Sequence, residues 1–322
     1  MIRKKVVICD PMDNIVIEIL EREAKVIYLP NVPERNLLNE VKEAHAVVVR
    51  GTTKIDHNLL DQTKNLLVIA KHGVGVDKID IEAATQKRIL VVNTPEANTE
   101  SVAEHNLGLM LALSKNICAS DRALRQGKVR RREDYIGIEL KGKKLGVIGL
   151  GRIGLETARK CRIAFDMEII GYDPYVPKEK INGLGYTKLE KMSDLLHEAD
   201  CVVISMPLTK ETVNLIGSAE LGLMKPNALL INSARGRIID EDALYDHLVK
   251  KKIAGAALDV FSQEPPNSEH PLLSLDNFIA TPHIGGSTVE AMRRSVITVA
   301  EEIVRVFHGQ RPRYPVNPEI YG

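Results

Sequence analysis

One short stretch, KGKKLGVIGLGRIGLETARK, constrains the fold more than any other part of the chain. It joins an apolar run, Leu145 to Gly149, to a helical run through a GxGxxG pattern. In such a context the first glycine makes a tight turn, the second lets backbone approach a pyrophosphate, and the third lets the helix pack on the strand. The helix N-terminus supplies amide donors to the phosphates. We therefore predict dinucleotide binding at Gly149, Gly151, Arg152, Ile153 and Gly154.

The residue that selects the nucleotide is expected about 20 residues further on, at the end of the next strand. Asp173, in EIIGYDP, stands at this place. A carboxylate there accepts hydrogen bonds from the adenosine ribose and repels a 2′-phosphate, so NAD is favoured over NADP. Two alternatives to NAD binding stay open. The motif could be a glycine-rich turn without a ligand, or Arg152 could bind the 2′-phosphate of NADP. The position of Arg152 inside the motif fits the pyrophosphate better.

Short β-branched runs alternate with polar stretches of helical period, which is the pattern of βαβ units and a parallel sheet. The early runs are Lys5 to Ile8, Val26 to Leu29, Ala46 to Val49, Leu67 to Ala70 and Ile89 to Val92. The late runs are Leu145 to Gly149, Glu168 to Tyr172, Cys201 to Ser205, Ala228 to Asn232, Ala254 to Leu258 and Phe278 to Ala280. The late runs would complete a six-stranded dinucleotide-type sheet. The predicted fold is α/β, with two Rossmann-like doubly wound parallel sheets.

A segment without proline, Asn98 to Gly127, interrupts this alternation. It reads as one long helix, which would bridge two domains or pack on a second subunit. A last helix, Thr288 to His308, precedes a proline-rich tail. If the tail returns to the first sheet, two segments cross between the domains, as in a hinge over a cleft. We predict a substrate domain at 1–98 plus 290–322 and an NAD-binding domain at 99–289.

Composition excludes several classes of function. The chain has 322 residues, with 44 basic against 43 acidic side chains and only 4 Phe, so nothing indicates a nucleic-acid or membrane surface. The apolar run near the N-terminus, Val6 to Cys9, is too short for a signal peptide, and we expect a cytoplasmic protein. The four cysteines are scattered without CxxC spacing, so we expect reduced thiols and no metal site.

Polar side chains follow the late strands, where open α/β sheets bind ligands. Arg235 comes after one strand, Asp259 and Glu264 after the next, and His283, in TPHIGGS, after the last. Taken alone, such a histidine is more often structural than catalytic, and Arg235 could form an ion pair on a loop. A carboxylate bonded to one imidazole nitrogen, however, favours the charged ring and orients the other nitrogen. Glu264 and His283 are thus a candidate acid-base pair.

A nicotinamide that accepts hydride needs a partner that takes a proton, and an oriented histidine does this near neutral pH. An arginine beside it polarises a carbonyl and holds a carboxylate in two parallel bonds. Together these parts predict the oxidation of a hydroxyl next to a carboxylate, or the reduction of a 2-oxo acid.

The motifs resemble those of the D-isomer-specific 2-hydroxyacid dehydrogenases over nearly the whole chain. They are GVGVDKID, SVAEHNLGLMLAL, GLGRIG with Asp173, NSARGRIIDEDAL, AGAALDVFSQEP and TPHIGGST. The resemblance implies a discontinuous substrate domain, a homodimer around the long helix, a 2-hydroxy or 2-oxo acid substrate and a catalytic set of Arg235, Glu264 and His283. It implies coenzyme contacts at Val74, Arg152, Ile153, Asp173, Met206, Pro207, Ser233, Ala234, Arg235, Asp259, His283, Gly285 and Gly286, and a substrate carboxylate on the amides of Val74 and Gly75.

Among subfamilies, the chain is similar to phosphoglycerate dehydrogenases without a regulatory domain. Arg50 matches a phosphate-binding position there and Lys71 a basic one, whereas His72 departs from the small residue usual at its place. Glu264 sets the chain apart from formate dehydrogenases, which have glutamine there. Arg130 to Arg132 resemble a basic loop that reaches a neighbouring site, or form a solvated charge run. Glyoxylate or hydroxypyruvate reduction, and an NADH-sensing corepressor-type role, are the alternatives.

Overall fold

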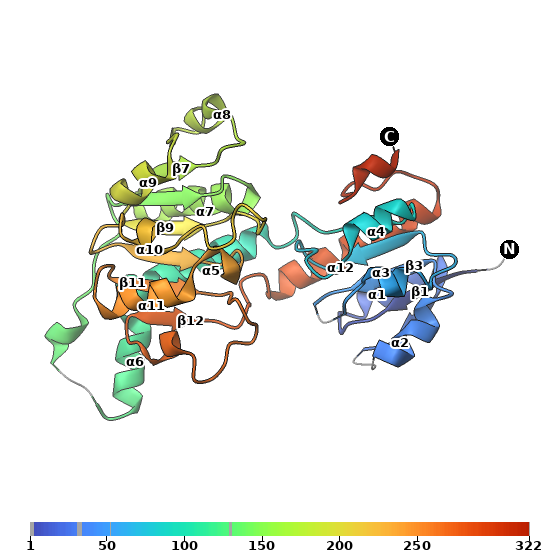
Figure 1. The fold of residues 1–322 in the computed structure, drawn as a ribbon, viewed down its shortest axis with the longest axis horizontal. Coiled ribbons are helices and arrows are strands. Elements are labelled where there is room, and N and C mark those ends of the chain that lie inside the picture. Colours follow the sequence, from blue (N-terminus) through green and yellow to red (C-terminus); the bar gives the residue numbers. More distant parts are fainter. Residues whose placement is uncertain (1–2, 31–33, 52, 129–130, 322) are drawn as a thin grey trace. The chain divides into compact units, whose positions relative to one another are not determined.

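The computed structural model describes residues 3–30, 34–51, 53–128 and 131–321, without the side chains of 34–36. The chain divides into two compact units, Met1–Asn98 with Ser287–Gly322 and Thr99–Gly286 (Figure 1). The sequence-based division placed the second crossing between the units after residue 289, whereas the structure has it after Gly286. Each unit contains one parallel sheet, so the predicted α/β class with two parallel sheets is confirmed.

The first unit contains a five-stranded sheet in the order β2-β1-β3-β4-β5, with every neighbouring pair parallel. Its strands are β1 (Lys4–Ile8), β2 (Ala24–Tyr28), β3 (Ala46–Val49), β4 (Val68–Lys71) and β5 (Leu90–Val92). This order reverses direction between β1 and β3, which is the switch point of a doubly wound sheet.

Helices cover both faces of this sheet, because alternate strand residues point to opposite faces and the central residues of the strands are apolar. One face packs against α1 (Ile15–Leu20) and α12 (Val289–Phe307), the other against α2 (Glu34–Val41), α3 (His57–Leu60) and α4 (Ile81–Gln86). After α12 the tail pairs with β5, since the Val316 amide donates to the Val91 carbonyl oxygen at 2.7 Å. It ends in a 3-10 turn, η4 (Pro318–Tyr321). The first unit is therefore built from two separate chain segments.

The second unit contains a seven-stranded parallel sheet in the order β12-β11-β10-β9-β6-β7-β8. Its strands are β6 (Lys144–Ile148), β7 (Glu168–Tyr172), β8 (Thr187–Lys188), β9 (Cys201–Ile204), β10 (Leu229–Asn232), β11 (Gly255–Leu258) and β12 (Phe278–Ala280). The prediction of six strands missed β8, because two residues are too short to show an apolar period. The order again reverses at one point, between β6 and β9.

Helices also cover both faces of the second sheet. One face packs against α5 (Thr99–Ser114) and α7 (Arg152–Phe165), the other against α9 (Met192–Glu198), α10 (Ser218–Leu221) and α11 (Glu241–Val249). The remaining elements are α6 (Ile117–Arg125), α8 (Lys178–Asn182) and the 3-10 turns η1 (Arg132–Tyr135), η2 (Gly236–Ile238) and η3 (Pro271–Ser274).

The predicted single helix from Asn98 to Gly127 is wrong, because the structure breaks it into α5 and α6. At the break Asn116 has a left-handed φ of 54°, and its side-chain amide donates to the carbonyl oxygens of Tyr135 and Ile136. The Ser114 carbonyl oxygen, which a continuous helix would use, instead accepts the Ile138 amide at 2.8 Å. Contacts with a distant segment thus end the helix, and the apolar pattern could not show them.

The four cysteines are free thiols, as expected, and three of them are buried. Burial raises the pKa of Cys161 and Cys201 to about 12, so neither forms a reactive thiolate near neutral pH. Among the described residues, no helix is long and apolar enough to cross a membrane.

Candidate active site

The loop after β6 places its glycines where the predicted motif requires them. Gly149 has a φ of 96°, and a Cβ there would lie 2.6 Å from the Ser205 carbonyl oxygen. A Cβ on Gly154 would lie 2.1 Å from the Gly149 carbonyl oxygen, so only glycine lets α7 pack this closely. Gly151, the N-cap of α7, has no atom within 4 Å of its Cβ position. The chain leaves open the space that a pyrophosphate would enter, beside the N-terminal amides of Arg152 and Ile153.

Asp173 follows β7 directly and is hydrogen-bonded to this loop. Its Oδ2 accepts the Leu150 amide at 2.9 Å, and its Oδ1 accepts the Tyr175 amide at 2.9 Å. The two bonds fix the carboxylate beside the glycine loop, where an adenosine ribose would meet it. The Gly149 turn also contacts the segment after β9, since its Cβ position lies 2.9 Å from the Met206 amide nitrogen. Met206 and Pro207 therefore stand next to the glycine loop, at the switch point of the sheet.

His283 lies three residues after β12, on a backbone with a left-handed φ of 55°. Its amide donates to the Asp259 carbonyl oxygen at 2.7 Å, which holds the turn against the end of β11. Its ring meets Glu264, with Nδ1 2.7 Å from Oε2. Because a carboxylate only accepts, Nδ1 carries the proton and Nε2 is directed away from this bond. The predicted pair is therefore brought together.

Both side chains of the pair are partly exposed to solvent, His283 by 50% and Glu264 by 39%. The hydrogen bond that His283 donates to Glu264, aided by the charge of the carboxylate, raises the pKa of His283 above the ordinary value. Burial alone would raise the pKa of Glu264, but His283, the Phe261 amide and the charge of Arg235 together lower it. The charge of Arg235 acts on both partners, so all three predicted catalytic residues lie near one another.

Asp259 accepts hydrogen bonds from the turn that carries His283, residues 281–286, which we call the histidine turn. Its carboxylate is 2% exposed and accepts the Ile284 and Gly285 amides, each at 2.8 Å, and the Thr281 hydroxyl at 2.6 Å. Burial alone would raise the pKa of Asp259, but His105 and these donors together lower it, so it is charged. Gly285 lies against this carboxylate and the His105 ring, so a Cβ at this position would lie only 3.0 Å from Asp259 Oδ2.

Arg235 lies in the turn after β10, and the turn is fixed by Asn232. The Asn232 side chain accepts the Ala234 amide and donates to the Arg235 carbonyl oxygen, each at 2.9 Å. The Arg235 guanidinium donates to the Ala234 carbonyl oxygen at 2.7 Å. The Ser233 hydroxyl donates to Asn106 on α5 at 2.7 Å. The turn from Ser233 to Arg235 is thereby held by side chains on two elements.

Sequence reasoning missed the supporting residues His105, Asn106 and Thr281. The ring of His105 contacts both Asp259 and Thr281, with Nε2 3.1 Å from the Thr281 hydroxyl. Asn106 is fully buried, and it donates to the Thr157 hydroxyl on α7. The available signal was a polar pair, His-Asn, directly before the apolar stretch Leu107 to Leu113.

The predicted substrate residues other than Arg235 and His283 lie in the first unit. Arg50 follows β3, Lys71 ends β4, and Val74 and Gly75 lie in the bend that follows. Neither amide of Val74 and Gly75 has an acceptor among the residues that the structure describes, so both remain available for an anion.

The basic segment that follows α6 is only partly described. Arg130 lies outside the described residues, and Arg131 and Arg132 are exposed. Arg131 lies 3.7 Å from the Asp134 carboxylate, which fits a solvated charge run.

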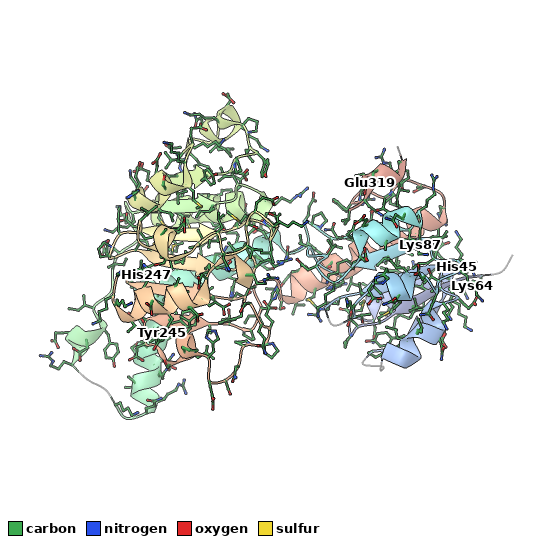
Figure 2. All side chains as sticks on the ribbon, viewed as in Figure 1. His45, Lys64, Lys87, Tyr245, His247 and Glu319 are labelled. Carbon is green, nitrogen blue, oxygen red and sulfur yellow. The ribbon has the colours of Figure 1, made fainter. Side chains whose placement is uncertain are left out.

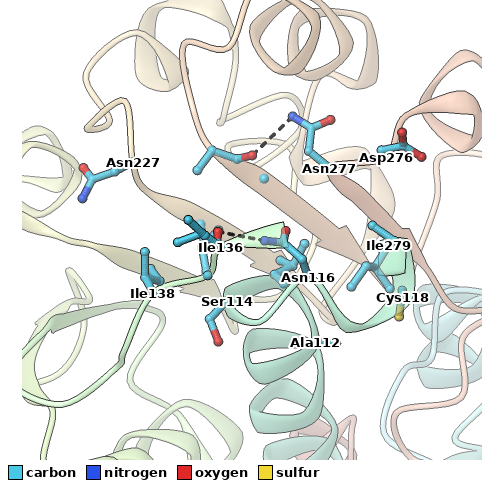
Figure 3. A pocket seen from close by; sticks show the side chains of 16 residues that line it. Ala112, Ser114, Asn116, Cys118, Ile136, Ile138, Asn227, Asp276, Asn277 and Ile279 are labelled. Atoms are coloured by element: carbon cyan, nitrogen blue, oxygen red, sulfur yellow. Dashed lines mark hydrogen bonds between the residues drawn. The ribbon is translucent and has the colours of Figure 1, made fainter. Parts of the chain in front are cut away.

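A buried histidine and a cavity in the second unit are not part of this site. His247 on α11 is buried, and its Nδ1 bonds the Ala243 carbonyl oxygen, as in a structural histidine (Figure 2). A cavity of about 210 Å³ lies by the α5–α6 break, lined by Asn116, Cys118 and the residues that precede β10, β11 and β12 (Figure 3). It therefore lies at the amino-terminal edge of the sheet, whereas the catalytic residues follow the carboxyl ends.

Comparisons with known proteins agree with this geometry. Residues 107–285 match the family described as D-isomer specific 2-hydroxyacid dehydrogenase, NAD binding domain. The chain is 40% identical to hydroxypyruvate reductase of Thermotoga maritima, over 95% of this chain and 99% of that protein. It resembles the structure of D-lactate dehydrogenase from Aquifex aeolicus complexed with NAD and lactic acid, with a TM-score of 0.85, 29% identity and coverage of 97% and 98%.

A further relative is longer than this chain. D-3-phosphoglycerate dehydrogenase of Methanocaldococcus jannaschii is 45% identical over 97% of this chain. The match spans only 59% of that relative.

Proposed function

The chain belongs to the D-isomer-specific 2-hydroxyacid dehydrogenase family, and we propose that it is an NAD-dependent enzyme that interconverts a D-2-hydroxy acid and its 2-oxo acid. The observation that carries this proposal is the 2.7 Å bond between His283 and Glu264 in the unit that contains the glycine loop. An oriented imidazole that can take or give a proton and a dinucleotide loop are the two parts that hydride transfer to or from a hydroxyl carbon requires.

The chain's own residues divide the remaining work. NAD, when bound, supplies the nicotinamide that accepts the hydride. In oxidation, Nε2 of His283 takes the hydroxyl proton while Glu264 stabilises the charged ring. In reduction, the same nitrogen returns a proton to the carbonyl oxygen. Arg235 holds the carboxylate beside the reacting carbon and polarises the carbonyl.

The coenzyme preference is proposed from Asp173. Its carboxylate is fixed beside the glycine loop by the Leu150 amide, where a 2′-phosphate would meet a negative charge. The contacts proposed for the coenzyme otherwise comprise the glycine loop with Arg152 and Ile153, the Met206–Pro207 segment, the Ser233–Arg235 turn, Asp259, the histidine turn with Gly285 and Gly286, and Val74.

We further propose that the substrate carries a second anionic group, as 3-phosphoglycerate does. Arg50 follows β3 and Lys71 ends the neighbouring strand β4, and the amides of Val74 and Gly75, which have no acceptor within the described part of the chain, suit the substrate carboxylate. The alternative is a small substrate such as hydroxypyruvate or glyoxylate, which the similarity to hydroxypyruvate reductase favours. In that case Arg50→Ala would leave the preference among substrates unchanged.

A panel of 2-oxo acids with NADH and NADPH separates these possibilities, with nicotinamide absorbance as the readout. We expect faster oxidation of NADH than NADPH and the highest kcat/KM for a 2-oxo acid with a phosphate. Highest kcat/KM for glyoxylate or hydroxypyruvate would support the alternative. If NADH binds but no substrate is turned over, the enzymatic proposal fails and a corepressor-type role for NADH is favoured.

We also propose that two chains associate through α5 and α6. None of the residues of α6 is buried, and Ile117, Leu124 and nearby Ile136 are 52%, 67% and 75% exposed. Apolar side chains gathered in this way are typical of an interface. Analytical ultracentrifugation should show a dimer, and Leu124→Asp should shift it toward monomer. A wild-type monomer at micromolar concentration would contradict the proposal.

A further inference from the structure

Glu241 stands at the start of α11, but its side chain binds a different loop. Its Oε1 accepts the Ser262 amide at 2.6 Å, and its Oε2 accepts the Ser262 hydroxyl at 3.0 Å. His270 Nε2 lies 3.1 Å from the same Oε2. Glu241 therefore receives three hydrogen bonds from two residues that are far from it in sequence.

This carboxylate is neither a solvated surface acid nor a helix cap. The Glu241 side chain is 11% exposed and the His270 side chain 21%. Asp240 already caps α11, because its side chain accepts the amides of Asp242 and Ala243. The contacts of Glu241 thus serve the loop at 261–264 and not the helix that carries it.

The loop that Glu241 holds is hydrogen-bonded directly to the catalytic pair. Phe261, which precedes Ser262, donates its amide to Oε1 of Glu264 at 3.2 Å. The other oxygen of Glu264 accepts the proton of His283 Nδ1. Any shift of the Phe261–Ser262 backbone would therefore move the carboxylate that orients His283.

The same loop also supports the arginine turn. A Cβ on Gly236 would lie 1.9 Å from the Phe261 carbonyl carbon, so the residue after Arg235 packs directly on this backbone. Glu241 follows Gly236 through η2 and the cap residue Asp240. One carboxylate thus ties the segment that carries Arg235 to the segment that carries Glu264.

We propose that Glu241 is a positioning residue, which fixes the 261–264 loop so that Glu264 keeps its bond to His283 and Gly236 keeps its packing beside Arg235. This inference rests on the proposed function of the three catalytic residues. It adds a carboxylate outside the catalytic set, one that acts through backbone and never touches the substrate.

The test compares Glu241→Gln with Asp242→Asn. Both remove one negative charge from the first turn of α11, but Asp242 is exposed and has no contact with the loop among the described residues. Glutamine can still accept the Ser262 amide through its oxygen, but its NH2 group only donates, so it can accept from neither the Ser262 hydroxyl nor His270. The readout is the pKa of His283, measured by NMR on protein labelled in its histidine rings, with a His283→Gln spectrum for assignment.

We expect the pKa of His283 to fall by about half a pH unit in Glu241→Gln, because Glu264 is held less firmly. We expect kcat to fall about 10-fold, and both quantities to stay at the wild-type value in Asp242→Asn. If Glu241→Gln does not fold, Ser262→Ala, which removes only the hydroxyl bond, should lower the pKa of His283 by a smaller amount.

An unchanged pKa of His283 in the folded Glu241 or Ser262 variant would overturn the inference, and so would an equal fall in Asp242→Asn. Loss of activity that merely follows a lower melting temperature would also contradict it. The NMR measurement needs no turnover. Failure of the proposed function would appear separately, as a wild-type protein that reduces no 2-oxo acid.

Discussion

The strand order of each parallel sheet reverses direction at one point. The two switch points differ in whether the chain itself supplies an anion there. In the first unit Asp10 follows β1 and is 2% exposed, and its carboxylate accepts the amides of Arg50 and Gly51 after β3. In the second unit Gly149 follows β6, and Gly151 leaves open space at the start of α7. One switch point is filled by the chain's own anion, whereas the other leaves room for the anion of a ligand.

A second contrast concerns two histidines that follow strands. His72 comes directly after β4 and is buried, and burial, with the charge of Arg50, lowers its pKa to about 4. His283 is half-exposed and bonded to Glu264, which raises its pKa. The first ring stays neutral near neutral pH, whereas the second can gain and lose a proton there. Similar architecture thus supports different chemistry, because the residues at the strand ends differ.

The largest expected effect comes from His283→Ala, which removes the proton-transfer group from the second unit. We expect kcat to fall about 1,000-fold in either direction, since general acid-base catalysis contributes effects of this size. NADH affinity should change little, because the glycine loop and Asp173 are untouched. Steady-state kinetics and a fluorescence titration of NADH measure the two quantities. Wild-type kcat in this variant would place the chemistry elsewhere.

A smaller effect should appear in the first unit with Asp10→Ala. The change removes the acceptor for the amides of Arg50 and Gly51, and we expect the free energy of unfolding to fall by about 2 kcal/mol. Chemical denaturation measures the loss, and hydrogen exchange should localise it to peptides that contain Arg50. Asp10→Asn, which keeps one acceptor oxygen, should lose less. Weakened NADH binding with unchanged stability would reverse the roles assigned to the two switch points.

Glu264→Gln should change the pH profile more than the maximal rate. Reduction needs the charged imidazole, so activity is present below the pKa of His283 and is lost as pH rises through it. Glu264 raises that pKa, and without its charge the pKa should fall. The alkaline limb of kcat/KM for reduction should therefore move to lower pH. A limb at the same pH as in the wild type would mean that Glu264 does not control His283.

Much of this arrangement could be predicted from the sequence, because its parts are local. The GxGxxG loop, Asp173 and the polar residues after the late strands all lie within a few residues of an apolar run. What sequence could not show depends on segments far apart in the chain. The break between α5 and α6 follows from contacts with residues 135–138, and Glu241 from contacts with Ser262 and His270. Neither leaves a periodic signal.

The most direct test of the contrast between the switch points is the affinity of Gly151→Ala for NADH, measured by calorimetry beside its melting temperature. The backbone φ of Gly151 is −76°, which alanine adopts readily, and its Cβ would meet no atom of the chain. We predict an unchanged or slightly higher melting temperature and an affinity for NADH at least about 10-fold weaker, because the methyl group would occupy the pyrophosphate's place. Wild-type affinity in this variant would contradict the assignment of this loop as the nucleotide site.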